Sequence, residues 1–262
     1  MFEFTKYDAK KRVKGSLALT LGIGALAAFY VLLYPSFTEG IDLDEYIKNL
    51  PPAIVEAFGL KSLGTIEGFL ASELYATMWV ILLGLYFAYS ASSIIADDVE
   101  RERMDILLSL PVSRSRIVLE KFLSLLVPIA FLNTIIPIIV YLTVTIIDRS
   151  IPVTDLIVVH ALSIPYLLVC AGIGLVMSVM FDRTSIAQRV SLGLVFGLFL
   201  IEAVVSSTDY RWVGGIAPMR YFEPTAILVD GEYDLIGGGI LLGGAIVLLI
   251  ASQLWFRQKD IN

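Results

Sequence analysis

Cysteine, histidine and charged residues are all scarce in this sequence. Its one cysteine, Cys170, excludes a disulfide framework and a thiolate zinc site, and its one histidine, His160, argues against a histidine-built metal site. Charged residues make up 17% of the 262 residues, whereas soluble domains have about a quarter. The net charge is −6 without a run of basic residues, so no nucleic acid is expected as a partner.

Motifs for nucleotide chemistry and for catalysis are absent too. The chain has no G-x-x-x-x-G-K-[ST] loop, so we expect ATP hydrolysis, if required, on another chain. No catalytic residue, metal site or bound cofactor is predicted. The glycines near the C-terminus start an apolar segment without a following lysine, which favours close helix packing over phosphate binding. These glycines are Gly237, Gly238, Gly239, Gly243 and Gly244.

Long apolar runs are what the sequence has in quantity. Hydrophobic residues make up 57% of the chain, and the mean hydropathy is +0.83. A helix that crosses the hydrocarbon core needs about 20 predominantly apolar residues. Six runs qualify, at 15–34, 75–95, 122–147, 156–181, 190–207 and 235–256. Because backbone groups in a bilayer must bond within their own segment, these runs predict an all-α polytopic protein with one transmembrane domain over 1–262.

The distribution of Lys and Arg predicts the orientation of these spans. Fourteen of these residues flank the spans on the side of both termini, and five lie on the opposite side. Basic residues concentrate on the cytoplasmic side of membrane proteins. We therefore expect cytoplasmic termini, with outer loops at 35–74 and 208–234. Residues 1–14 are predicted to form an interfacial helix attracted to anionic lipid headgroups.

The connection between the second and third spans, at 96–121, has an unusual pattern. Asp97 and Arg101, and Arg101 and Asp105, are spaced i, i+4, which supports a helix. Pro111 should end that helix, because the residue before a proline avoids helical geometry. A charged helix followed by a sharp break is therefore expected on the cytoplasmic side.

Three apolar residues of this connection share one face of the expected helix: Met104, Leu107 and Leu108. A short helix with an apolar ridge between charges suits docking into a groove of a soluble partner. The same ridge also suits a helix hairpin that lies on the bilayer surface. The residue pattern alone leaves both interpretations open.

Two polar residues stand out inside the spans. Glu202 is the one acid within the six runs, and intramembrane acids are candidates for function. It either reaches the headgroups or a dimer interior, or it contacts a polar or cationic group of a substrate. Asn133 in the third span either bonds across helices or lines the same path. Both are candidate residues of a substrate path.

The connection at 96–121 also resembles a known signature. Leu107-Leu108-Ser109-Leu110-Pro111-Val112-Ser113-Arg114, followed by Ile117-Val118-Leu119-Glu120-Lys121, is similar to the segment between the second and third spans of type-two ABC exporter permeases. Weaker similarities to these permeases follow at 50–59, 67–70, 217–231 and 256–261.

This resemblance implies a membrane subunit of an ATP-driven exporter that works by alternating access in a prokaryotic plasma membrane. It implies pairing with a second permease copy or a homologous permease, and one cytoplasmic ABC ATPase subunit per half, which binds ATP and Mg. It also implies that the helix between the second and third spans couples the two proteins. The candidate coupling residues are Glu100, Arg101, Arg103, Met104, Asp105, Leu107, Leu108, Leu110, Pro111 and Arg114. Secondary transporters and membrane scaffolds are the alternative classes.

Overall fold

The computed structural model describes residues 3–40, 48–51, 54–55, 63–104, 107, 109 and 111–259. These residues form helices and connecting turns, with no strand among them. Six segments are long and apolar enough to cross a membrane, which confirms the predicted fold class. The described elements are α1 (Glu3–Gly40), α4 (Ile66–Leu70), η2 (Ala71–Leu83), α5 (Gly84–Ser92), α6 (Ala96–Glu100), α8 (Arg114–Leu123), α9 (Leu126–Ile146), α10 (Val153–Met180), α11 (Thr184–Val205), η3 (Arg211–Ile216), η4 (Pro218–Tyr221), η5 (Ala226–Asp230) and α12 (Leu235–Gln258).

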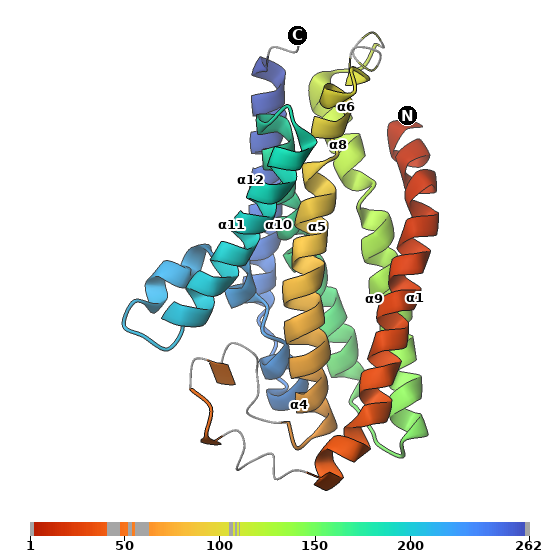
Figure 1. Cartoon of the computed structure of the whole chain (residues 1–262), viewed down its shortest axis with the longest axis vertical. Helices are drawn as coiled ribbons and strands as arrows, with labels where there is room; N and C mark the ends of the chain where they lie inside the picture. Colours follow the sequence, from red (N-terminus) through yellow and green to blue (C-terminus); the bar gives the residue numbers. More distant parts are fainter. Residues whose placement is uncertain are drawn as a thin grey trace.

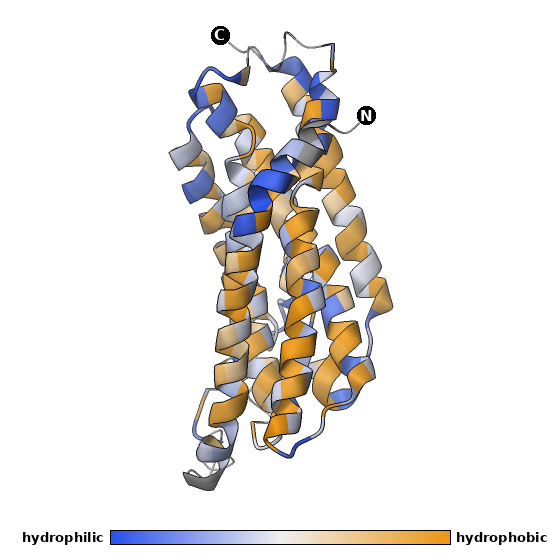
Figure 2. Ribbon diagram, turned by 90° about the vertical axis from the view of Figure 1, so that its right-hand side faces the viewer, coloured by the Kyte–Doolittle hydropathy of each residue, from blue (hydrophilic) through white to orange (hydrophobic). Residues whose placement is uncertain are grey.

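The helices stand side by side in an elongated bundle (Figure 1). The start of α1, α6, the start of α8 and the end of α12 lie together at one end, which we call the terminal end because both termini lie there. The opposite end, which we call the loop end, holds α4 and the end of α1. Hydrophobic residues dominate the middle of the bundle, and hydrophilic residues gather towards the terminal end (Figure 2). This banding is the pattern expected of a protein that crosses a bilayer.

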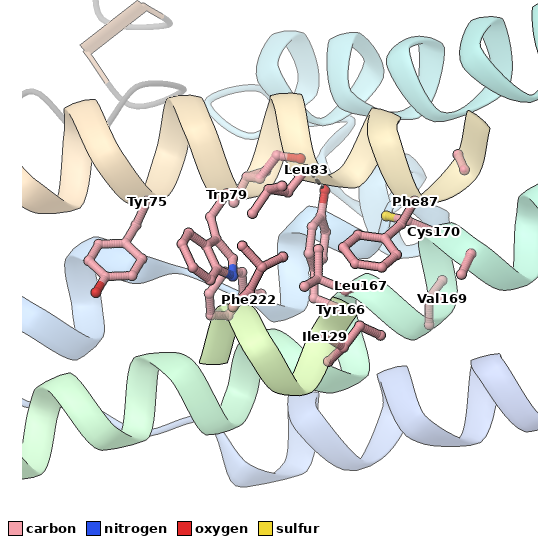
Figure 3. Close-up of a cluster of buried hydrophobic side chains, with 14 of the residues drawn as sticks. Tyr75, Trp79, Leu83, Phe87, Ile129, Tyr166, Leu167, Val169, Cys170 and Phe222 are labelled. Atoms are coloured by element: carbon pink, nitrogen blue, oxygen red, sulfur yellow. Dashed lines mark hydrogen bonds between the residues drawn. The ribbon is translucent and has the colours of Figure 1, made fainter. Parts of the chain in front are cut away.

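The α10 helix is the centre of the bundle. It packs along both α5 and α12, while α1 packs along α9. Aromatic residues fill the space between α10 and the second span, where Tyr75, Trp79 and Phe87 are fully buried (Figure 3). Tyr166 of α10 donates a hydrogen bond to the carbonyl oxygen of Val80 at 2.7 Å, which satisfies its hydroxyl within this apolar surrounding.

The first span is longer than expected. A single helix, α1, covers Glu3–Gly40, so from Glu3 onward the helix predicted at 1–14 is continuous with the first span instead of separate from it. Residues 3–14 contain no proline or glycine, and the single Gly15 at the start of the apolar run does not break the helix. Pro35 lies within α1, near its loop end. The first outer connection therefore starts after Gly40 rather than at Pro35.

The second span also starts earlier than predicted, because helical structure runs from Ile66 to Glu100. Thr65 caps its start, where the hydroxyl accepts a hydrogen bond from the Gly68 amide at 3.1 Å. The span continues through η2, a π-helical stretch. It therefore includes Glu73, which the sequence assigned to the first outer loop.

A glycine sets the closest approach between α5 and α10. A Cβ atom added at Gly174 would lie 2.1 Å from the carbonyl oxygen of Ala88. A Cβ atom added at Gly237, Gly238 or Gly244, three of the five C-terminal glycines, would lie within 4 Å of other atoms of the chain. A Cβ atom added at Gly239 or Gly243 would have no neighbour within that distance. The close packing predicted for these two glycines is therefore not made within the described part of the chain.

Gly174→Ala is expected to lower the free energy of unfolding by about 1–3 kcal/mol, because the new methyl group would collide with the Ala88 backbone. Gly193→Ala in α11 is the matched control, since a Cβ atom there has no neighbour within 4 Å. Both variants can be measured by unfolding in mixed detergent micelles. Equal stability of the two would contradict the close approach.

Candidate functional site

The segment that follows the second span is where the sequence placed its coupling helix. Asp97 and Arg101 form the predicted ion pair at 2.7 Å. The helix α6 nevertheless ends at Glu100, and Glu102 has a φ of 56°, in the left-handed region. The chain is helical again at Met104 and Leu107. The expected continuous helix is therefore wrong at Arg101–Arg103, where a turn interrupts it.

Three of the candidate coupling residues, Asp105, Leu108 and Leu110, lie outside the described residues. Met104 is fully buried, and Leu107 is half-buried against the same core. These two side chains therefore anchor the segment to the bundle instead of forming an exposed ridge. The exposed residues here are Glu100, Arg101, Glu102, Ser109 and Pro111.

A group of ion pairs joins this turn to two other helices. Lys121 of α8 contacts Asp98 of α6 at 2.6 Å and Asp8 of α1 at 3.5 Å. Arg103 pairs with Asp98 at 2.8 Å and also with Asp97. The Lys121 and Asp98 side chains are each only 11% exposed. We call these five residues the terminal-end ion network; it links the first, second and third spans.

Further polar contacts attach the start of α1 to α8. Glu120 is 1% exposed. Its carboxylate accepts hydrogen bonds from Arg116 Nε at 2.7 Å and from the Thr5 amide at 3.3 Å. Arg12 donates to Ser124 Oγ at 3.0 Å and to Ser90 Oγ at 3.2 Å. The first three turns of α1 are thereby held against the other spans.

The same end of the bundle also contacts the fifth and sixth spans. The Glu100 carboxylate accepts a hydrogen bond from the Thr184 amide at 2.9 Å, at the start of α11. An acid at a helix N-terminus is favoured by the free amides there. Arg114 donates to the Phe256 carbonyl oxygen at 3.3 Å and lies over the Phe256 ring, 5.8 Å from its centroid. The amides of Ile95 and Ala96 also donate to Ser178 Oγ of α10, at 2.9 and 3.0 Å. The segment around α6 is therefore connected, directly or through α8, to all of the other five spans.

Asn133 belongs to a different group, inside the bundle. Its Oδ1 accepts a hydrogen bond from Ser163 Oγ at 2.7 Å and lies 3.1 Å from His160 Nδ1. His160 Nε2 is 2.9 Å from the Tyr75 hydroxyl, and the Trp79 ring meets the histidine edge-on. Of the two interpretations of Asn133, the structure shows the one in which it bonds across helices.

Glu202 lies near the C-terminal end of α11 and is 8% exposed. Its Oε2 is 4.0 Å from Arg220 Nη1. Glu202 lines a cavity of about 130 Å³ beside this arginine. Neither Asn133 nor its partners His160 and Ser163 lines that cavity, so the two candidate path residues belong to separate surroundings.

The family model for ABC-2 family transporter proteins matches residues 7–212. This match covers most of the chain, from α1 to the start of η3. The chain belongs to the ABC-2 family. It is therefore the permease of an ABC transporter, a membrane transport subunit that is not itself catalytic. A comparison with curated proteins found no match.

The ABC-2 match includes the whole terminal-end ion network. The sequence had pointed to this connection, but not to Lys121 as the residue that joins three helices. The one feature of the sequence that could have indicated this role is the position of Lys121, directly before the apolar run of the third span. Arg116 and Glu120 of this permease, spaced i, i+4, were a second signal for an ordered α8.

Lys121→Met is expected to destabilise the permease by about 3 kcal/mol or more, because it leaves the buried Asp98 carboxylate without its closest cation. Arg101→Ala is the matched control, since this arginine is 65% exposed and its pair with Asp97 contributes about 1 kcal/mol at most. Unfolding in mixed micelles measures both. A Lys121→Met variant as stable as the control would contradict the network.

Asn133→Leu is expected to lower the free energy of unfolding by about 1 kcal/mol, because it removes the acceptor shared by Ser163 and His160. Thr145→Val, which loses a bond only to its own helix, should have a smaller effect. Thermal denaturation in detergent compares them. The interhelical role of Asn133 is wrong if the two variants unfold together.

Proposed function

We propose that this ABC-2 permease is the membrane subunit of an ATP-driven exporter in a prokaryotic plasma membrane. Its terminal end faces the cytoplasm and receives a separate ABC ATPase subunit, which binds ATP and Mg. The terminal-end ion network is the observation that carries this proposal. It converts a short exposed segment into an element rigidly attached to the first three spans.

The exposed residues around the turn form the docking surface of this proposal. Glu100, Arg101, Glu102, Ser109 and Pro111 present both charges and a rigid bend to a partner. Complementary charges at such a surface fix the register of two proteins and speed their association. Met104 and Leu107 hold the segment from behind, because their side chains pack on the core.

The mechanical path follows from the contacts behind this surface. A displacement of the turn reaches α1 and α8 through Asp98 and Lys121, and it reaches α11 through Glu100. Breaking a buried ion pair leaves an uncompensated buried charge, which is costly. Two helices joined by such a pair therefore move together, and a displacement of one reaches the other. In a dimer with a second permease copy, opposite movements of the two sets of spans would open the path alternately to each side.

The distribution of charge supports the orientation. Fourteen Lys and Arg flank the spans at the side of the termini and five at the other, and the excess belongs in the cytoplasm. Anionic lipid headgroups at that surface are a further partner of the permease. They attract the exposed lysines of α1, such as Lys10, Lys11 and Lys14.

Glu102→Arg is expected to reduce copurification of the ATPase by about tenfold, which corresponds to about 1.4 kcal/mol, because it reverses an exposed charge in the docking surface. The matched control is Asp209→Arg, an exposed charge reversal outside the described coupling segment, between α11 and η3. Quantitative pull-down from native membranes in a mild detergent measures both.

A wild-type preparation without any nucleotide-binding protein would contradict the proposed function and favour a secondary transporter or a scaffold. Equal loss of the ATPase from both variants would contradict the docking surface alone. ATP-driven movement of cargo in inverted vesicles then decides the direction, because an exporter with this orientation moves cargo into the vesicle lumen.

A further inference from the structure

A large cavity lies at the terminal end of the bundle, between α1, the segment around α6 and α8. It has a volume of about 540 Å³, which is within the range of small-molecule sites. All five residues of the terminal-end ion network line it, together with Tyr7, Lys11 and Arg12 of α1. The cavity therefore combines paired charges with charges from α1 that the network does not use.

The charges of the ion network compensate one another. Its three carboxylates are contacted by Lys121, by Arg103 and by Arg101, which pairs with Asp97. Three acids and three bases leave this part of the lining neutral. Lys11 and Arg12 add two positive charges, and neither makes an ion pair within the described part of the chain. The lining therefore has an excess of positive charge, which α1 supplies.

The two α1 cations also have free donors that an occupant can reach. Arg12 is half-buried, and its hydrogen bonds to Ser90 and Ser124 use two of the five N–H groups of the guanidinium. Lys11 is exposed and has no hydrogen-bond partner among the described residues, so its ammonium group keeps three donors. Tyr7, beside them, is 71% exposed and adds a hydroxyl.

These donors suit a phosphate group. Arginine binds phosphate through parallel N–H bonds, and lysine binds it as a point charge. A phosphate ester carries one or two negative charges at neutral pH, which matches the two cations that have no ion-pair partner. Its oxygens can accept hydrogen bonds from Lys11 and Arg12 at the same time.

The position of the cavity is that of a lipid headgroup. Lys14 is the last charged residue of α1 before the apolar run, so Lys11 and Arg12 lie within one turn of the point where the helix becomes apolar. Hydrophilic residues gather towards this end of the bundle (Figure 2). Basic pockets between spans at such a surface bind anionic headgroups.

The face of α1 that carries Lys11 continues into the apolar part of the helix. Ala18, Gly22 and Ala25 follow Lys11 at helical spacing, and all three are exposed. Their small side chains leave space for a hydrocarbon tail along this face. The cavity and this face together offer a phosphate site and a surface for a tail.

We infer that this cavity binds the phosphate group of an anionic ligand at the membrane surface, supplied by a phospholipid headgroup or by a free phosphate ester. Lys11 and Arg12 hold the phosphate, and Tyr7 is a further donor. Arg103 and Leu107 line the same cavity, so an occupant also joins α1 to the segment that follows α6. The inference goes beyond the proposed function, because it concerns neither the cargo nor the ATPase.

The test is an equilibrium titration of the full-length permease in a neutral detergent, without ATP or the ATPase. Dioctanoyl phosphatidylglycerol should bind saturably, and zwitterionic dioctanoyl phosphatidylcholine should bind at least about tenfold more weakly. Lys11→Gln should weaken the binding of phosphatidylglycerol by about tenfold, because it removes a charged hydrogen-bond donor. This variant should fold like the wild type, since the Lys11 side chain is exposed and has no partner in the described part of the chain.

Lys10→Gln is the matched control. Lys10 is exposed on the same helix but does not line the cavity, so its replacement should leave the binding of phosphatidylglycerol unchanged. Equal weakening by Lys10→Gln and Lys11→Gln would indicate diffuse attraction to a basic surface and would overturn the inference. Equal binding of the two lipids, or no saturable binding of any phosphate compound, would overturn it as well.

The same titration with glycerol 3-phosphate distinguishes the two sources of the phosphate. If it binds at least about tenfold more weakly than phosphatidylglycerol, the site belongs to a lipid headgroup, because the tails then contribute to binding. If its affinity is within tenfold of that of the lipid and depends on Lys11, the site belongs to a free phosphate ester. Either result supports a phosphate site in this cavity.

Discussion

The ion pair between Lys121 and Asp98 is the contact on which the organisation of the terminal end depends. It joins α8 to α6, and the same lysine reaches Asp8 of α1. Charges with so little exposure are costly unless each has a partner in good geometry. The three helix ends are therefore held in one arrangement, and the turn at Glu102 is presented from a fixed base. A segment that receives force from a partner needs this property, because a loosely attached segment would absorb the displacement.

Polar contacts also determine the arrangement inside the bundle, for a reason specific to membranes. Lipid tails are as apolar as the side chains of the spans, so apolar burial alone favours no particular rotation of a helix. The bonds among Tyr75, His160, Asn133 and Ser163 do favour one, because each would otherwise leave a polar group in hydrocarbon. Close contact at Gly174 fixes the distance between α5 and α10. Together these contacts give the central spans a defined geometry around α10.

The sequence predicted the six spans because long apolar runs follow directly from the thickness of the bilayer. It predicted helix ends less well, since Pro35 and the acids Glu67 and Glu73 resemble loop residues but lie within helices. The ABC-2 family was recognisable from the motif that ends at Lys121. The burial of Met104 could not be predicted in the same way. It depends on the turn at Arg101–Arg103, which interrupts an apparently regular i, i+4 pattern. The partners of Lys121, Asn133 and Glu202 come from other helices, and one sequence contains no information on their crossing.

The central claim is that the turn after α6 faces the cytoplasm and contacts an ATPase subunit. Photo-crosslinking in native membranes tests it most directly, with a photoreactive amino acid placed at position 102 in one variant and at position 209 in another. The account predicts that a P-loop ATPase is captured from position 102 and not from position 209. Capture from position 209 alone, or capture of no ATPase from either position, would contradict it.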